Sequence, residues 1–151
     1  MKNKYLFFAV FSLLLFSLLA ADTAALDMEK SAVKKVILSA YRDGICNVGD
    51  VAAIDKGFHP DFNLLMLQEN KLGKLPIAKW KEYVTKNKAA GKYPPEEKVA
   101  FKFLFVDVIG NAAAAKIEFY KGKTLAYTDF LLLYKFNDGW KLVSKIYHQH
   151  K

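Results

Sequence analysis

Residues 127–148 read YTDFLLLYKFNDGWKLVSKIYH, and they predict a β-hairpin. Two apolar runs rich in aromatic residues flank NDG (137–139), and a short turn of this type between such runs is typical of a hairpin. Counted outward from the centre of the turn, Asp129 pairs with Tyr147, so Lys145 becomes a diagonal neighbour of Asp129 on one face. We therefore expect Asp129 and Lys145 to form an ion pair or a polar pair in a pocket, with a structural role favoured.

The residues before this hairpin continue the strand pattern. Two further apolar runs, KVAFKFLFVDV (98–108) and NAAAAKIEFY (111–120), are bounded by Gly-containing turn signals at 109–111 and 121–123. Because connections this short make consecutive strands antiparallel neighbours, the C-terminal half predicts a four-stranded meander. Several of these strands are apolar on both faces, which predicts that the outer face of the sheet packs on a partner subunit in a homodimer.

The segment ahead of the sheet predicts three helices. Apolar residues recur at intervals of three and four across residues 33–45, as on one face of an amphipathic helix. Asp50 as an N-cap and Gly57 as a stop enclose a second, short helix. Pro76 suits the first turn of a third helix, whose inner face would carry Ile77, Trp80, Tyr83 and Val84. Helices first and a sheet last make an α+β domain.

The first 25 residues have the composition of a secretory signal peptide. Two lysines precede an uncharged apolar run (5–20), which is shorter than the ~20 residues needed to cross a bilayer. Small residues follow this run, so cleavage after Ala25 is expected, with cleavage after Ala21 and an uncleaved anchor as alternatives. We expect residues 26–151 to form one exported domain, periplasmic or secreted, without stable membrane insertion after cleavage.

The charge and the cysteine count narrow the classes of function. The net charge is +8, but an exported location argues against nucleic acid as a partner, and the lysines are spread along the chain as on a solvated basic surface. The single cysteine, Cys46, leaves no internal disulfide and is interpreted as a small buried residue rather than a nucleophile. The sequence carries no metalloprotease, serine hydrolase or phosphate-loop motif and no Cys/His spacing that predicts a metal or cofactor site.

Three segments resemble one known superfamily: DVAAIDKGFHPDF (50–62), YTDFLLLYKF (127–136) and DGWKLVSKIYH (138–148). With the order of helices and strands, they are similar to the nuclear transport factor 2-like (SnoaL-like) superfamily, and within it to small exported bacterial proteins of the putative lumazine-binding family. The resemblance runs from Ala32 to His148. It implies a cone in which N-terminal helices pack on a strongly curved antiparallel sheet and close one side of a pocket. Function does not follow, because the superfamily includes isomerases, dehydratases and domains without catalysis.

An enzyme is the first alternative that the resemblance raises. Ketosteroid isomerase-like members use a carboxylate general base shortly after the position resembling Asp61 and a second carboxylic acid on a late strand. Here these neighbourhoods read NLLMLQE (63–69) and FLLLYKF (130–136), which supply neither group. An isomerase- or dehydratase-like enzyme using Asp129 or His59 stays as the alternative, and a scaffold for a periplasmic protein partner is a third hypothesis.

A non-catalytic protein that binds a small molecule is the favoured function. Aromatic walls with a few polar tips suit a small amphipathic or aromatic ligand. From the sheet, one alternating set among Phe101, Phe103, Phe105, Tyr127 and Asp129 would face this ligand. The predicted ligand-binding residues are Tyr41, His59, Trp80, Tyr83, Phe103, Tyr127 and Asp129.

The stretch GFHPDF (57–62) contributes one member of this set. In an extended segment, His59 and Asp61 point to one side, while Phe58 and Phe62 point to the other. We expect the two phenylalanines to anchor the segment in the core and Asp61 to accept hydrogen bonds from nearby backbone N–H groups. His59 is then either a ligand contact at the rim of the pocket or a structural histidine.

Overall fold

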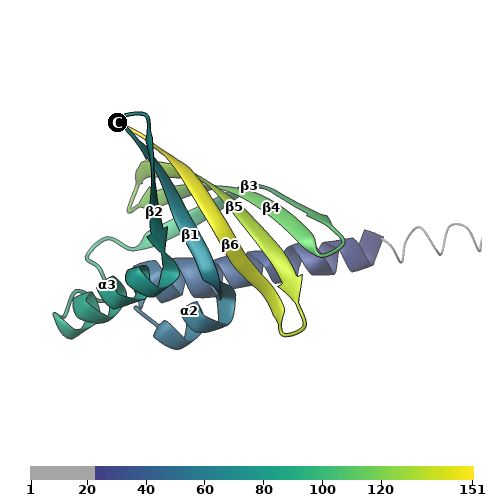
Figure 1. Cartoon of the computed structure of the whole chain (residues 1–151), viewed down its shortest axis with the longest axis horizontal. Coiled ribbons are helices and arrows are strands. Elements are labelled where there is room, and N and C mark those ends of the chain that lie inside the picture. The colour runs from purple at the N-terminus through teal and green to yellow at the C-terminus, as the bar shows by residue number, and fades with distance from the viewer. Residues whose placement is uncertain (1–22) are drawn as a thin grey trace, which may run out of the picture.

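The computed structural model describes residues 23–151, so the predicted signal peptide lies almost wholly outside the described residues. An α-helix over residues 23–36 continues directly into the π-helix η1 (Ile37–Asn47), and together they form the long helix of Figure 1. Two shorter helices follow, α2 (Val51–Gly57) and α3 (Ile77–Ala89). Within the described part of the chain, no helix is both long and apolar enough to span a membrane.

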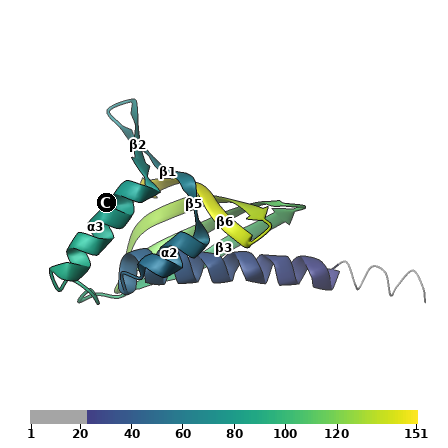
Figure 2. The same cartoon turned by 60° about the horizontal axis from the view of Figure 1, so that its bottom comes forward.

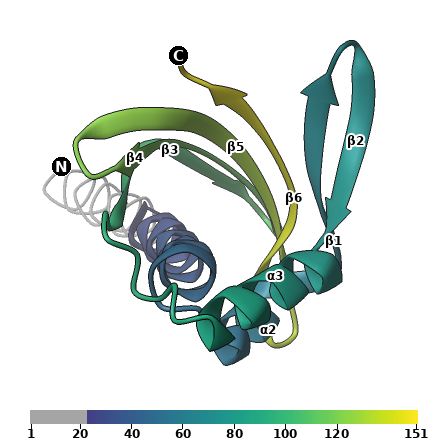
Figure 3. The same ribbon diagram turned by 90° about the vertical axis from the view of Figure 1, so that its left-hand side faces the viewer.

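Six strands form one sheet in the order β2-β1-β6-β5-β4-β3. The sheet curves around the long helix without closing, and α2 and α3 lie along its open side (Figures 2 and 3). This arrangement confirms the predicted α+β cone. The strands are β1 (Phe58–Gln68), β2 (Lys71–Pro76), β3 (Val99–Ile109), β4 (Ala112–Lys121), β5 (Thr124–Phe136) and β6 (Gly139–Gln149).

The prediction of a four-stranded, wholly antiparallel sheet is wrong, because β1 and β2 add a further hairpin to it. This hairpin turns through Glu69 and Asn70, which both have positive φ angles, as the two central residues of a type I′ turn require. The β1 strand pairs in parallel with β6, so the sheet is mixed. In Figure 3 the hairpin projects from the rest of the sheet, because β1 contacts β6 near one end.

The C-terminal hairpin has the predicted register. Asp129 of β5 lies opposite Tyr147 of β6, and Lys145 lies opposite Leu131, one pair along on the same face. Register shifts interrupt the pairing of β3 with β4, of β4 with β5 and of β5 with β6. Such bulges bend and twist the strands, which produces the curvature of the cone.

One bulge also changes which face β3 shows to the helices. The register shifts between Phe103 and Phe105, so Phe105 lies opposite Lys116 and is 45% exposed. Phe101 and Phe103 lie before the bulge and pack against the buried core. The expected alternation of Phe101, Phe103 and Phe105 on one face therefore stops at Phe103.

The helices pack on the concave face of the sheet. Asp50 caps α2 as predicted, because its carboxylate accepts hydrogen bonds from the backbone N–H groups of Ala52 and Ala53. Phe58 and Phe62 are both buried, which confirms that they anchor the GFHPDF segment in the core. The Asp61 side chain, in contrast, is 93% exposed, and its carboxylate lies 3.7 Å from His59 Nδ1 instead of accepting from the backbone N–H groups nearby, so the expected role of this carboxylate is wrong. The backbone N–H of Asp61 donates to His59 Nδ1 at 3.2 Å.

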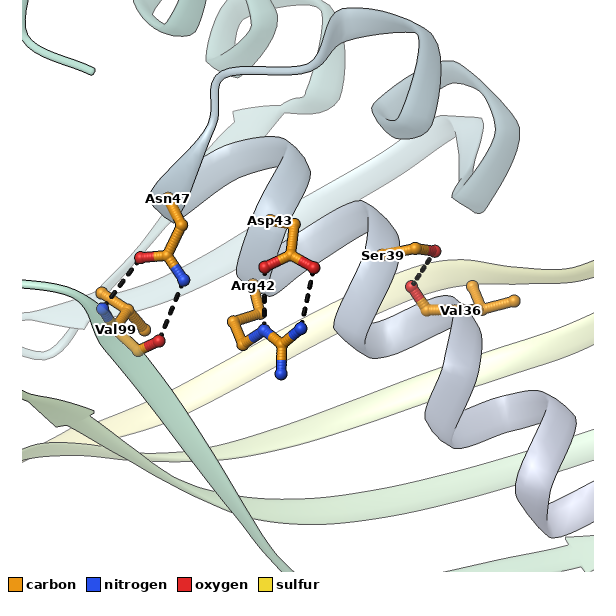
Figure 4. Close-up of polar contacts among 6 residues, drawn as sticks. All are labelled: Val36, Ser39, Arg42, Asp43, Asn47 and Val99. Atoms are coloured by element: carbon orange, nitrogen blue, oxygen red, sulfur yellow. Dashed lines mark hydrogen bonds and ion pairs between the residues drawn. The ribbon is translucent and has the colours of Figure 1, made fainter. Parts of the chain in front are cut away.

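A side-chain clamp ties the end of η1 to the first residue of β3. Asn47 Oδ1 accepts from the Val99 N–H at 2.8 Å, and Asn47 Nδ2 donates to the Val99 carbonyl at 3.0 Å (Figure 4). The amide thus pairs with the outer edge of β3 as a neighbouring strand would. This clamp holds the C-terminal end of η1 against β3, next to the residues that form the functional site described in the following section.

Candidate functional site

A cavity of about 230 Å³ opens between the concave face of the sheet, η1 and α3. Five of its residues carry rings, two carry ammonium groups, and the cavity mouth is open to solvent. The size suits a small molecule of one or two fused rings. The cavity is lined by Tyr41, Cys46, Leu64, Trp80, Phe119, Lys121, Tyr127, Lys145 and Tyr147.

The π-helical form of η1 explains how this helix contributes two side chains to the same wall. Hydrogen bonds in a π-helix join residues five apart, so Tyr41 and Cys46 lie one turn apart on one side of the helix. In an α-helix, residues five apart diverge around the axis, because the turn closes after 3.6 residues. The wide turns of η1 therefore present both residues to the cavity.

Aromatic rings pack against one another along the cavity wall. The Tyr41 ring lies 5.8 Å from the Trp80 ring, and the Tyr127 ring lies 5.4 Å from both the Phe119 and the Tyr147 rings. These centroid distances fall within the range of favourable edge-to-face contacts. The rings are thereby held in fixed orientations around the open space, as a site for a flat ligand requires.

A buried polar network lies behind these rings. Asp129 Oδ2 accepts a hydrogen bond from the Tyr41 hydroxyl at 2.8 Å and lies 2.8 Å from Lys145 Nζ. Lys145 Nζ also donates to the Tyr41 oxygen. Asp129 is fully buried and the Lys145 side chain is 6% exposed, so the predicted ion pair between them is confirmed and lies in the core.

The Lys145 ammonium is surrounded by rings. Its Nζ lies 4.5 Å from the centre of the Tyr41 ring, 5.4 Å from that of Tyr147 and 5.8 Å from that of Trp80. Cation–π attraction at these distances partly replaces the hydration that the ammonium loses. Burial lowers the pKa of Lys145, and the charge of Asp129 opposes this shift.

Tyr41 and Cys46 are held in their neutral forms. Burial, reinforced by the negative charge of Asp129, raises the pKa of Tyr41 well above its usual value. Burial also raises the pKa of the Cys46 thiol to about 12. One atom stands out in the part of the chain that the structure describes: Asp129 Oδ1 is buried and has no hydrogen-bond partner.

The predicted site residues separate into two groups. Tyr41, Trp80 and Tyr127 line the cavity, and Asp129 lies directly behind it through its hydrogen bond to Tyr41. The remaining three, His59, Tyr83 and Phe103, lie outside the cavity. Their positions depend on tertiary packing, which the local sequence pattern does not show.

Each of these three side chains has a different neighbour outside the cavity. His59 stacks on Phe136, with ring centres 4.8 Å apart and planes 18° apart. Tyr83 is 45% exposed on α3 beneath the Lys79 ammonium, because the apolar stripe of this helix is narrow and runs through Ile77 and Val84. Phe103 packs on the core with the Lys34 ammonium over its ring.

Several lining residues were not among the predicted ligand-binding residues. Tyr147 and Lys145 carry a detectable signal, because the hairpin register puts both on the face of Asp129. Phe119 and Lys121 lie on the same face of β4 as its buried residues, but which face of the strand turns inward depends on the packing of the helices. Leu64 belongs to β1, which was not predicted as a strand.

A second hollow lies beside the end of η1 and is less suited to binding. It measures about 460 Å³ and is lined by Arg42, Asp43, Lys98 and neighbouring residues of β3. Arg42 and Asp43 pair with each other through two hydrogen bonds of 2.8 Å (Figure 4), so their charges are already satisfied. Among residues 23–151 there is also no cluster of three or more His, Cys, Asp or Glu side chains that could hold a metal ion.

Comparison with solved structures supports the fold. An NTF2-like protein of unknown function from Shewanella baltica is 28% identical, with a TM-score of 0.65 over 82% of this chain and 95% of that one. A second NTF2-like protein of unknown function, from Silicibacter pomeroyi, is 19% identical, with a TM-score of 0.64 over 80% of this chain and 94% of that one.

A third similar structure bears a more specific description. It is a putative aromatic ring hydroxylase from Novosphingobium aromaticivorans, 16% identical, with a TM-score of 0.56 over 82% of this chain and 90% of that one. At this identity it is evidence for the fold alone. A search of curated proteins found no match.

Comparison with models of protein families shows which family the chain belongs to. The model of one family, described as putative lumazine-binding, matches residues 28–148, which include every strand but for the last residue of β6. The matched region contains the whole of the cavity lining and the buried Tyr41–Asp129–Lys145 network. The chain belongs to the putative lumazine-binding family of NTF2-like proteins.

Proposed function

We propose that the protein binds a flat heteroaromatic small molecule bearing carbonyl oxygens, such as a pteridine-dione of the lumazine type, and does not turn it over. The observation that carries the proposal is the Lys145 ammonium, which lies in a cavity wall between the rings of Tyr41, Trp80 and Tyr147. The rings offer stacking surface, and the ammonium offers hydrogen-bond donors to an acceptor oxygen. The family description agrees with this class of ligand.

The charge of the cavity favours an acceptor-rich or anionic ligand. Lys121 and Lys145 both line it, and Asp129, the carboxylate behind its wall, is already bonded to Tyr41 and Lys145. A ligand with carbonyl oxygens can therefore engage an ammonium without facing an unpaired carboxylate across the cavity. A cationic ligand would meet two like charges, which disfavours it.

Absence of turnover is supported by the state of the groups near the ligand space. A general acid or base must reach the substrate and exchange a proton near neutral pH. Asp129 is fully buried, and the raised pKa values of Tyr41 and Cys46 keep both protonated. His59, the other catalytic candidate, lies outside the cavity against Phe136.

Tryptophan fluorescence tests the proposal, because Trp80 lines the cavity and Trp140, the other tryptophan, is buried against Glu29. Titration of the purified protein with lumazine should quench its fluorescence in a saturable manner. The Trp140→Phe variant should keep this quenching and the Trp80→Phe variant should lose it. Unsaturable quenching, or equal quenching in both variants, would contradict binding in the cavity.

Export is part of the proposal and rests on the first 25 residues alone. Their two lysines, apolar run and small residues are the features that a signal peptidase recognises. Fractionation of cells that produce the protein should recover it outside the cytoplasm, with a new N-terminus at Asp22 or Leu26. Recovery of the full-length chain in the cytoplasm would contradict export.

Homodimerisation through the convex face of the sheet is also proposed. Phe105, Phe130 and Ile146 occupy one row across β3, β5 and β6, with Lys116 of β4 between the two phenylalanines. All three apolar side chains are exposed, as are Leu132 and Tyr134 in the next rows along β5. Light scattering should give the mass of a dimer for the protein and of a monomer for Leu132→Glu. A monomeric mass for the unaltered protein would favour a different partner for this face.

A further inference from the structure

Lys145 differs from the other lysines of the described chain in that it is buried, and at the same time it lines a cavity large enough for a ligand. An amine that is desolvated but reachable by a bound molecule is the form in which lysine acts as a nucleophile toward carbonyl groups. We infer that Lys145 captures aldehydes or ketones carried on a flat ring by forming a Schiff base with them. This inference rests on the proposed function, since the ring must first enter the cavity.

The position of the ammonium suits an attack on a stacked ligand. Its nitrogen lies within 6 Å of three ring centres, which are those of Tyr41, Trp80 and Tyr147. A ligand ring in contact with these side chains brings its substituents close to the nitrogen. Binding then replaces a bimolecular encounter by a reaction between two held groups, which raises the effective concentration of the carbonyl.

The amine must lose a proton before it can attack, and the network supplies an acceptor for it. Asp129 Oδ2 lies 2.8 Å from Lys145 Nζ, and Asp129 Oδ1 is buried without a partner. Transfer of the proton from the ammonium to the carboxylate turns two buried charges into two neutral groups. Burial favours the neutral form of the amine, which assists the transfer. The lowered pKa of Lys145 likewise favours the loss of its proton.

The reaction balances within the site. The nitrogen lone pair attacks the carbonyl carbon, the C=O π pair moves to oxygen, and a proton passes from nitrogen to that oxygen to give a carbinolamine. The hydroxyl leaves as water through the open mouth as the C=N bond forms, with a proton that passes from the Asp129 carboxylic acid by way of the Tyr41 hydroxyl, which contacts Asp129 and belongs to a residue that lines the cavity. The product is an iminium on Lys145 beside the restored Asp129 carboxylate, and no oxidant or further reactant is consumed.

Reductive trapping tests the inference. The purified protein is incubated at neutral pH with 6-formylpterin and sodium cyanoborohydride, which reduces an iminium to a stable secondary amine. We expect one adduct per chain by intact mass and its location on Lys145 by peptide mapping. Lys145 should be labelled faster than any exposed lysine, because its lowered pKa raises the fraction of free amine and the bound ring holds the carbonyl beside it.

Two variants control for general lysine reactivity. Lys145→Met should lose the adduct, whereas Lys79→Met, which removes an exposed lysine paired with Glu82, should keep it. Circular dichroism establishes that each variant is folded. If Lys145→Met does not fold, the peptide map of the unaltered protein still decides, because labelling spread over exposed lysines overturns the inference.

A matched alcohol separates this inference from the proposed function. 6-Hydroxymethylpterin has the same ring system as the aldehyde but cannot form a Schiff base. Quenching of Trp80 by the alcohol without labelling of Lys145 by the aldehyde would overturn covalent capture and leave the binding function standing. If neither compound quenches or labels, the proposed pteridine site is wrong.

Discussion

Replacement of Asp129 by asparagine should destabilise the protein strongly at neutral pH and much less at alkaline pH. Asp129 is fully buried and is the counter-charge of Lys145, whose side chain is 6% exposed. An amide at this position leaves the ammonium without a negative partner in the core. Removal of one partner from a buried ion pair costs roughly 3–5 kcal/mol.

Deprotonation of Lys145 sets an upper bound on this loss. An unfolded lysine has a pKa of about 10.4, so removing its proton at pH 7 costs about 4.6 kcal/mol, and this figure falls by about 1.4 kcal/mol per pH unit. Burial lowers the pKa of Lys145 and Asp129 opposes the shift, so the variant should have a still lower pKa. Between that lowered value and 10.4, the unfolded state binds more protons than the folded state, and the stability of the variant rises with pH.

We therefore expect Asp129→Asn to lose about 3–4 kcal/mol at pH 7 and no more than about 2 kcal/mol at pH 9. Urea unfolding followed by circular dichroism at the two pH values measures both differences from the unaltered protein. Asp138→Asn is the control, because Asp138 pairs with Lys141 at the surface, and this variant should unfold like the parent at both pH values. An equal loss at pH 7 and pH 9 would refute the account of Lys145 as a buried, titrating ammonium.

Three further predictions concern η1 and its contacts. Gly57→Ala should cost roughly 1–3 kcal/mol in urea unfolding, because the new Cβ would lie 2.4 Å from the Cβ of Ala40; a neutral effect would contradict this packing. Cys46, with its pKa raised to about 12, should resist iodoacetamide at pH 8 in the folded protein and react fully in urea, as mass spectrometry can determine. Asn47→Ala should cost about 1–2 kcal/mol and accelerate hydrogen exchange at the Val99 amide, and unchanged exchange would show that the clamp is dispensable.

Local patterns predicted the elements whose partners are close in sequence. The NDG turn fixed the pairing of Asp129 with Tyr147, and Asp50 and Gly57 bounded α2 where the structure has it. The β1–β2 hairpin was missed because its type I′ turn is formed by Glu69 and Asn70, without the glycine that usually marks such turns. The parallel pairing of β1 with β6 joins distant segments, and no local signal specifies it.

The site residues whose positions follow from strand register could be predicted from the sequence. Those whose positions depend on the curvature of the sheet could not. The hairpin put Lys145 beside Asp129, but a sequence pattern does not show that Tyr41 of η1 completes the network. The bulge after Phe103 and the narrow apolar stripe of α3 decide that Phe105 and Tyr83 face solvent. Such choices are made by packing of the helices on the sheet, which propensity and periodicity do not describe.

Tyrosine NMR tests the central claim, that the cavity beside Lys145 is a ligand-binding site, most directly. Lumazine is titrated into protein labelled with ¹³C at tyrosine, and the resonances are assigned by Tyr→Phe variants. The account predicts saturable shifts at Tyr41, Tyr127 and Tyr147, which line the cavity, and none at Tyr83 or Tyr134, which are exposed on α3 and on the convex face of β5. Shifts at Tyr83 or Tyr134 without shifts at the three cavity tyrosines, or no saturable shift at all, would contradict it.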